Sequence, residues 1–253
     1  MFTIGIDCGS RMTKLCLFDL EGSLIKDTII MDSNENHEEL FSQMIDIVLK
    51  KNDLTKDKIL YVNTTGYGRK NFSGARRTVS EIISHAKGVN YFNPQIKTII
   101  DIGGQDTKII KITDKGKVLD FVMNDKCAAG TGRFLEKVAD FFKLDIAELG
   151  EIALKSYIQL EISSTCVVFA ESEIINLITS GHKREDIINA VHFSIINRIL
   201  SMSGQIQIEF PLAFVGRVAK NIGMVNAMKK SLENFIYVPP IPEMTGAVGV
   251  AIC

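Results

Sequence analysis

An internal repeat restricts the fold of this chain more than any other feature of the sequence. Residues 4–24 read IGIDCGSRMTKLCLFDLEGSL and residues 98–118 read TIIDIGGQDTKIIKITDKGKV, at a constant offset of 98 − 4 = 94 positions. Each copy contains an apolar strand, an aspartate, a glycine-containing turn, Thr-Lys and a second strand, which is the pattern of a β-hairpin. A hairpin that occurs twice predicts a duplicated α/β fold. The identical pairs are Asp7 and Asp101, Gly9 and Gly103, Thr13 and Thr107, Lys14 and Lys108, and Gly22 and Gly116.

Apolar periodicity extends the repeat beyond the two hairpins. Each hairpin leads into a third predicted strand, residues 24–31 or 118–123, and then into a helical pattern, residues 38–50 or 131–142. The chain therefore contains two similar α/β halves. Further strands are predicted at residues 59–63, 212–215 and 235–238, and a last helix that can pack back on the first half is predicted to start near Thr245.

The composition fits two lobes of a soluble protein. A chain of 253 residues, 46% of them apolar, can bury the core of one large or two modest domains. No low-complexity linker separates the halves, so we expect two closely associated lobes, residues 1–94 and 95–253. The net charge is −1, from 29 basic and 30 acidic residues without a basic stripe, which argues against a nucleic-acid partner. No apolar run reaches the ~18 residues of a membrane span, and residues 1–10 do not resemble a signal peptide. We therefore expect a cytoplasmic protein with no membrane partner.

The repeated turns have the composition of phosphate-binding loops. Glycine allows the backbone N–H groups to approach an anion closely. An aspartate at the end of the preceding strand, Asp7 or Asp101, can bind Mg²⁺ through water. Two such loops that face each other would hold a triphosphate from both sides.

The segments DCGSRMTK (residues 7–14) and DIGGQD (residues 101–106) resemble the two phosphate loops of the actin/Hsp70/sugar-kinase superfamily. The segments FVGRVAKN (residues 214–221) and GAVGVA (residues 246–251) resemble its adenosine-binding region. The resemblance implies a ribonuclease-H-like fold in each half, with Mg²⁺ and ATP or ADP in the cleft between them. The nucleotide-binding residues that it implies are Gly9, Ser10, Arg11, Thr13, Lys14, Gly103, Gly104, Gly216, Arg217, Lys220, Gly246 and Ala247.

Two further points follow from this resemblance. Gln105 or Asp106 would orient the attacking water, as a positioned side chain does in other phosphoryl-transfer sites. Related sequences commonly have Gly-Gly where this chain has Gly216 and Arg217. If Arg217 points into the cleft, it either stacks on adenine or obstructs it.

Two of the five cysteines restrict the resemblance to one family within this superfamily. Cys127, in NDKCAAGTGRFL (residues 124–135), precedes a glycine-containing turn, and Cys166, in SSTCVVFAESE (residues 163–173), precedes a helical run. A helix N-terminus favours a thiolate and an anionic metal–sulfur centre. With NTTGYGR (residues 63–69) and VSEIISHAK (residues 79–87), these segments closely resemble the activators of 2-hydroxyacyl-CoA dehydratases and the ATPase subunits of benzoyl-CoA reductases.

This narrower family implies the cofactor and the partners. Its members are homodimers that share one 4Fe–4S cluster, and Cys127 and Cys166 match the two ligands that each chain supplies. By resemblance, ATP hydrolysis drives a low-potential electron from the cluster to a dehydratase or a related CoA-ester reductase. A ferredoxin or flavodoxin would supply the electron.

The remaining cysteines and the histidines have simpler interpretations. Cys8 and Cys16 are expected to be buried packing residues, and Cys253 is expected to fray at the end of the chain. The four histidines are scattered, and His192 is expected to be a hydrogen-bonded helix residue. Residues 182–186, HKRED, are expected to form a solvated helix start.

Two other function classes compete with the activator. A sugar kinase or pantothenate kinase of the same superfamily would need a substrate pocket and a catalytic base, and the sequence offers no persuasive base. A nucleotide-dependent structural or regulatory protein would resemble actin-like filaments. The context of Cys127 and Cys166 argues against both.

Overall fold

The computed structural model describes residues 1–125, 127–163 and 166–253. Lys126, Ser164 and Thr165, which belong to the two cysteine segments, lie outside the described residues. The chain divides into two compact units: residues 1–96, 112–119 and 243–253 form the first, and residues 97–111 and 120–242 form the second. Segment 112–119 groups with the first unit, and so does segment 243–253, which contains the last helix that the sequence allows to pack back on the first half.

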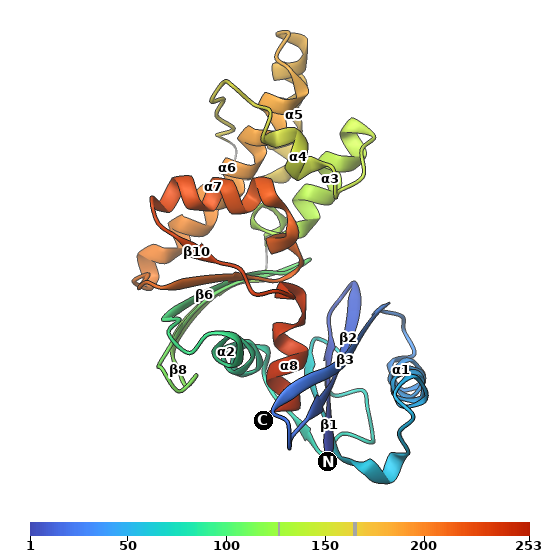
Figure 1. The fold of residues 1–253 in the computed structure, drawn as a ribbon. Helices are drawn as coiled ribbons and strands as arrows, with labels where there is room; N and C mark the ends of the chain where they lie inside the picture. The colour runs from blue at the N-terminus through green and yellow to red at the C-terminus, as the bar shows by residue number, and fades with distance from the viewer. Residues whose placement is uncertain (126, 164–165) are drawn as a thin grey trace. The chain divides into compact units, whose positions relative to one another are not determined.

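Each half of the chain contributes one five-stranded sheet, and the two sheets have the same topology (Figure 1). In both, the first strand pairs antiparallel with the second and parallel with the fourth. The sequence repeat therefore corresponds to the repeat of a whole sheet. In spatial order, the first sheet contains β3 (Leu24–Asp32), β2 (Met12–Asp19), β1 (Phe2–Cys8), β4 (Ile59–Gly66) and β5 (Arg77–Thr78). The second contains β8 (Val118–Asn124), β7 (Thr107–Ile112), β6 (Thr98–Ile102), β9 (Leu212–Val215) and β10 (Ile236–Tyr237).

Helix α1 (His37–Lys51) covers one face of the first sheet. Its apolar residues recur at helical spacing, and the side chain of Asn36 caps its first turn by accepting from Glu39 N at 3.3 Å. Phe41 and Met44 are fully buried in one cluster with Ile4 and other residues of β1 and β2. The burial of this stripe explains why the helix forms where the apolar period of residues 38–50 predicts it.

Helices α2 (Glu81–Phe92) and α8 (Thr245–Ala251) complete the first unit. Every residue of α8 is buried, as expected for a helix without a polar face, and α8 contacts both β1 and α2. Thr3 Oγ1 donates to Ala251 O at 2.8 Å, and Asn63 Nδ2 donates to Val250 O at 3.3 Å. The last helix thus packs on the first sheet, although it follows the second in sequence.

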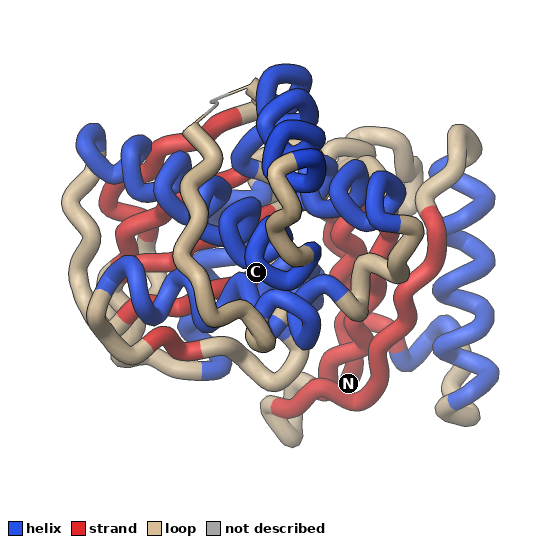
Figure 2. The backbone as a smooth tube through the Cα atoms, turned by 90° about the horizontal axis from the view of Figure 1, so that it is seen from above, coloured by secondary structure: helices blue, strands red, loops and turns tan. Residues whose placement is uncertain are grey.

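The second unit is mainly helical around its sheet. Its core joins β6 and β9 to the buried faces of five helices. Figure 2 shows helices against the strands of each sheet. The helices are α3 (Gly132–Phe142), α4 (Leu149–Ala153), α5 (Val167–Thr179), α6 (Arg184–Met202) and α7 (Ile222–Leu232). Short 3-10 helices are η1 (Lys56–Lys58), η2 (Ala128–Gly130), η3 (Ser203–Gln205), η4 (Arg217–Lys220) and η5 (Pro242–Met244). Within the three described ranges, no helix is long and apolar enough to cross a membrane.

The local predictions at α6 hold except at Asp186. The helix starts within residues 182–186, and Lys183 and Arg184 are exposed, as predicted. Asp186 is buried instead, because its carboxylate accepts from Ser156 Oγ at 2.8 Å and from Tyr157 N at 3.2 Å. Burial raises the pKa of Asp186, but these hydrogen bonds outweigh it and hold the pKa below its ordinary value. His192 is a hydrogen-bonded helix residue, as predicted, because its Nε2 lies 3.4 Å from Asn221 Nδ2. It is fully buried, and its Nδ1 has no hydrogen-bond partner among the described residues. Burial lowers the pKa of His192 to about 3, so the imidazole stays neutral.

Candidate functional site

Each predicted phosphate loop begins with a buried ion pair across a hairpin. In the first sheet, the strand register places Asp7 opposite Lys14, and Lys14 Nζ lies 3.3 Å from Asp7 Oδ2. In the second sheet, Asp101 lies opposite Lys108, with the same distance of 3.3 Å between Nζ and Oδ2. Asp7 is 5% exposed and Asp101 is 3% exposed. The repeat therefore extends from the sequence to the polar contacts of its side chains.

The first loop is held by a residue that the sequence interpretation missed. Ser33, just after β3, donates from Oγ to Gly9 O at 2.7 Å and from its backbone N to Arg11 O at 2.9 Å. The hydroxyls of Ser33 and Thr13 are 2.9 Å apart. Ser10 and Arg11 remain exposed at the tip. The loop therefore presents an exposed tip on a fixed base, which suits close approach of an anion.

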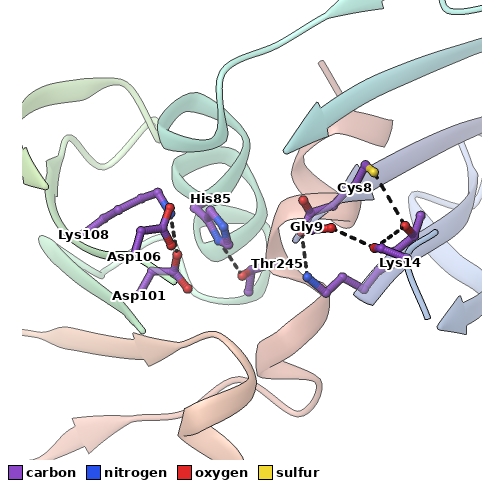
Figure 3. A network of polar contacts seen from close by, with 11 residues as sticks. Cys8, Gly9, Lys14, His85, Asp101, Asp106, Lys108 and Thr245 are labelled. Carbon is purple, nitrogen blue, oxygen red and sulfur yellow. Dashed lines mark hydrogen bonds and ion pairs between the residues drawn. The ribbon is translucent and has the colours of Figure 1, made fainter. Parts of the chain in front are cut away.

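The second loop contains a second ion pair. Lys108 Nζ lies 2.7 Å from Asp106 Oδ2, so Lys108 bridges Asp106 and Asp101 (Figure 3). Gly103 N donates to Asp106 O at 2.9 Å and closes the turn. Gln105 is exposed at the tip. Asp106 and Gln105 thus occupy different environments within one loop.

Each sheet places a glycine with positive φ beside its aspartate. Gly66 is the last residue of β4 and has φ +90°, and Gly216 follows β9 with φ +84°. A Cβ atom built on Gly216 would lie 2.6 Å from Asp101 Oδ1, and one on Gly66 would lie 2.7 Å from Asp7 Oδ1. Only glycine combines this φ with such close packing. These two glycines are therefore a further part of the repeat, which the sequence alignment at offset 94 does not reveal.

The substitution Gly216→Ala tests this packing. The new methyl group would meet Ile102 O at 2.5 Å in addition to the Asp101 carboxylate. We expect the free energy of unfolding to fall by about 2 kcal/mol, the order of the cost of a strained backbone position. The matched control is Gly204→Ala, because a Cβ there has nothing within 4 Å. Urea denaturation measures both variants, and equal stability of the two would contradict a packing role for Gly216.

The predicted adenosine-binding residues lie in both units. Arg217 and Lys220 are exposed at the two ends of η4 in the second unit. Gly246 and Ala247 lie in the first turn of α8 in the first unit, and a Cβ on Gly246 would lie 2.8 Å from Asp7 Oδ2. His85 Nδ1 is 2.9 Å from Thr245 Oγ1, which fixes the start of α8 on α2 (Figure 3). The start of α8 is thus packed against the first aspartate.

Cys127 is half-buried between β8 and η2. The side chain of Asn124, the last residue of β8, binds both backbone groups of Cys127. Cys127 N donates to Asn124 Oδ1 at 3.2 Å, and Asn124 Nδ2 donates to Cys127 O at 3.1 Å. Cys127 is the N-cap residue of η2, and α3 begins only at Gly132. The backbone at this thiol is thus fixed at the end of a strand.

Cys166 is the exposed N-cap residue of α5. Ala170 N donates to Cys166 O at 2.9 Å, the first hydrogen bond of the helix. On the same helix, Glu173 accepts from Ser163 N at 2.8 Å and from Ser163 Oγ at 2.9 Å. Ser163 is therefore held against the helix that begins after Cys166. Val168 and Phe169, two and three residues after Cys166 in the sequence, are exposed.

The other three cysteines differ from this pair. Cys8 and Cys16 are fully buried, as predicted, and burial raises the pKa of Cys16 to about 12 and raises that of Cys8. Cys253 is half-buried rather than frayed, because Asn63 Nδ2 donates to its carbonyl oxygen at 3.2 Å. Over the described part of the chain, no group of three or more His, Cys, Asp or Glu side chains forms a site for a metal ion.

Comparison with known families agrees with this geometry. Residues 4–253 match the model of the BadF/BadG/BcrA/BcrD ATPase family. The chain belongs to this family. It is 42% identical over 253 residues, 100% of this chain and 94% of the relative, to the 2-hydroxyisocaproyl-CoA dehydratase activator of Clostridioides difficile.

Solved structures confirm the predicted fold class of this BadF/BadG/BcrA/BcrD ATPase. The activator of the 2-hydroxyisocaproyl-CoA dehydratase from Clostridium difficile, with bound ADPNP, has a TM-score of 0.92 at 42% identity and covers 100% of this chain and 93% of its own. Component A of the (R)-2-hydroxyglutaryl-CoA dehydratase from Acidaminococcus fermentans has a TM-score of 0.94 at 35% identity, with coverage of 100% and 96%. A ROK family glucokinase from Streptomyces griseus has a TM-score of 0.57 at 13% identity, with coverage of 100% and 98%, which shows a shared fold alone.

The two units of this ATPase divide the predicted site residues between them. Each unit brings one loop together with an Asp–Lys ion pair, the second loop adds Asp106 to its pair, and the second unit also contains both candidate cysteines. The roles of these residues stay predictions. The first unit contains Asp7, Gly9, Ser10, Arg11, Thr13, Lys14, Gly246 and Ala247. The second contains Asp101, Gly103, Gly104, Gln105, Asp106, Cys127, Cys166, Gly216, Arg217 and Lys220.

Proposed function

We propose that this chain is an ATP-driven reductive activator of a 2-hydroxyacyl-CoA dehydratase or a related CoA-ester reductase. One observation carries the proposal: the turn that begins with Cys127 is hydrogen-bonded to the second nucleotide loop. Gly132 N donates to Gly103 O at 2.9 Å, and Arg133 N donates to Gly104 O at 3.1 Å. A change at the nucleotide would therefore act on the backbone next to a candidate metal ligand.

The nucleotide part of the proposal rests on the repeated loops. Asp7 and Asp101 would hold Mg²⁺ through water, and the exposed loop tips would hold the phosphates. The relative with bound ADPNP supports a nucleotide as ligand. Asp106 is engaged by Lys108 at 2.7 Å, which favours Gln105 as the residue that orients the attacking water.

The donor set fits an iron–sulfur cluster shared by two chains. Cys127 and Cys166 are the half-buried and exposed thiols of the second unit, and each lies at the start of a helical turn. A 4Fe–4S cluster takes four thiolates, so two chains related by a two-fold axis would supply the set. When bound, such a cluster stores and passes one electron at low potential. The exposed apolar side chains of Val168 and Phe169 support burial against a second copy of this chain.

The contacts between the second loop and the turn after Cys127 would couple ATP hydrolysis to electron transfer. The loops would close on ATP and open after hydrolysis. In switch proteins, small movements of this kind at a ligand site produce larger conformational changes elsewhere. The second loop would pass such a change to η2 and α3 through the backbone bonds at Gly103 and Gly104. This would alter the exposure of Cys127 and the fit to a partner. The electron donor, a ferredoxin or flavodoxin, and the cytoplasmic location stay predictions.

The test is iron and acid-labile sulfide per chain, measured on protein purified without oxygen, together with its molar mass in solution. We expect about two irons and two sulfides per chain in a dimer, since four thiolates hold four irons. Protein that stays free of metal after anaerobic reconstitution would refute the activator proposal. A kinase or a nucleotide-driven switch would then be tested next.

A further inference from the structure

The turn after Cys127, residues 127–132, is attached to the second hairpin by a buried side chain. Thr107, the first residue of β7, is fully buried and donates from Oγ1 to Gly130 O at 2.5 Å. Gly130 is buried and lies three residues after Cys127. At the other end of the turn, Gly132 N donates to Gly103 O at 2.9 Å. The hairpin thus contacts this turn from two of its own residues.

Thr107 is also next to the ion pairs of the second loop. The following residue is Lys108, whose Nζ lies 3.3 Å from Asp101 Oδ2 and 2.7 Å from Asp106 Oδ2. Successive side chains of a strand point to opposite faces. Lys108 therefore faces the carboxylates while Thr107 faces the turn after Cys127. One short piece of β7 connects the two.

The internal repeat shows that this contact is particular to the second half. The counterpart of Thr107 is Thr13, which is equally buried. Thr13 Oγ1 instead lies 2.9 Å from Ser33 Oγ, and it donates to Cys8 Sγ at 3.6 Å. The same threonine, in the same hairpin position, thus contacts the side chain of Ser33 just after β3 in the first half and a backbone carbonyl of the turn after β8 in the second.

We propose that Thr107 is a positioning residue that transmits the nucleotide state of the second loop to Cys127. This inference rests on the proposed function, since it assumes that the second loop binds nucleotide. A buried hydroxyl that loses its acceptor has no water to replace it, so the hairpin and the turn move together. Thr107 itself takes no part in binding phosphate.

The variant Thr107→Val tests the link, because valine keeps the β-branched shape and removes the hydroxyl. The readout is the alkylation rate of Cys127 by iodoacetamide in metal-free protein, followed on the Cys127 peptide by mass spectrometry, with and without a non-hydrolysable ATP analogue. In the unsubstituted chain we expect nucleotide to change this rate. In Thr107→Val we expect the ratio of the two rates to move about fivefold closer to one, the order of effect of one lost hydrogen bond.

Two further variants make the result specific. Thr107→Ser keeps the hydroxyl and should restore the nucleotide response. Thr98→Val makes the same substitution in β6, where a fully buried threonine accepts from Glu209 N at 2.9 Å away from the cysteine turn, and should leave the response unchanged. Thermal unfolding checks that each variant folds, and Thr107→Ala replaces Thr107→Val if the latter does not.

The outcomes separate this inference from the proposed function. A normal nucleotide response in folded Thr107→Val or Thr107→Ala overturns the role of Thr107, and so does an unsubstituted chain whose Cys127 does not respond to nucleotide. The alkylation assay needs no cluster. A chain that binds no iron but shows the Thr107-dependent response would therefore refute the activator proposal and leave the link supported.

Discussion

Replacement of either Cys127 or Cys166 by serine is expected to remove the iron and acid-labile sulfide from the anaerobically purified protein. A 4Fe–4S cluster takes thiolate ligands, and in the proposed two-fold dimer each substitution would delete two of the four. We expect iron content below about a tenth of that of the unsubstituted chain, since the loss of ligands removes most of the binding free energy. Iron analysis and visible absorbance measure this directly.

The same variants should keep their ATP-binding loops. Cys166 begins α5 and Cys127 follows β8, and neither side chain contributes a hydrogen bond that caps its helix. We therefore expect nucleotide binding to persist in both variants. Cys253→Ser is the matched control, because this half-buried cysteine lies in the first unit, and it should retain iron. A normal iron–sulfur spectrum in Cys127→Ser or Cys166→Ser would show that the ligand assignment is wrong.

Asp101→Asn is expected to reduce ATP turnover by about a hundredfold, the order of the effect of one lost charge at a preorganised site. The substitution keeps the shape of a side chain that is 3% exposed but removes the charge that would hold Mg²⁺. Lys108 keeps its second partner, Asp106, at 2.7 Å. Phosphate release under saturating Mg-ATP is the measurement, and the iron content should be unchanged.

Asp120→Asn is the control for this loss of charge. Asp120 lies on β8 in the second sheet, and its carboxylate is exposed and accepts from Phe121 N at 2.8 Å, a bond that asparagine can retain. ATP turnover should be unaffected. If Asp101→Asn hydrolysed ATP as fast as Asp120→Asn, the second aspartate would have no role at the phosphates. Thermal unfolding separates a catalytic loss from a loss of folded protein.

The strands, the two hairpins and the cysteine segments could be predicted because their signals are local. The period of apolar residues gives strands and helices, and the repeat fixes which residues face each other across a hairpin. That is why the pairs of Asp7 with Lys14 and of Asp101 with Lys108 follow from sequence once the register is known. The strand predicted at residues 59–63 continues to Gly66, because the residues up to Gly66 still pair with β1.

The remaining features depend on partners far apart in the chain. Ser33 lies 33 − 9 = 24 residues beyond the glycine that it holds, and nothing in its neighbourhood marks it as part of a loop. Asp186 looks solvated within a charged run, but it accepts hydrogen bonds from a segment about 30 residues earlier. His192 has a typical helical context, and only the packed core shows that its Nδ1 is left without a partner among the described residues. Local patterns do not encode such contacts.

The duplication also has an evolutionary consequence. With the same offset of 94, Ser33 corresponds to position 33 + 94 = 127, which is Cys127. In the first copy, the hydroxyl of Ser33 contacts Thr13 and stabilises the loop. In the second copy, Thr107 donates to Gly130 O instead, and the position equivalent to Ser33 has the thiol of Cys127. Serine and cysteine differ by one atom. The duplication thus kept a hydroxyl as loop anchor in the first copy, while the second copy has a thiol, a candidate metal ligand, at the same position.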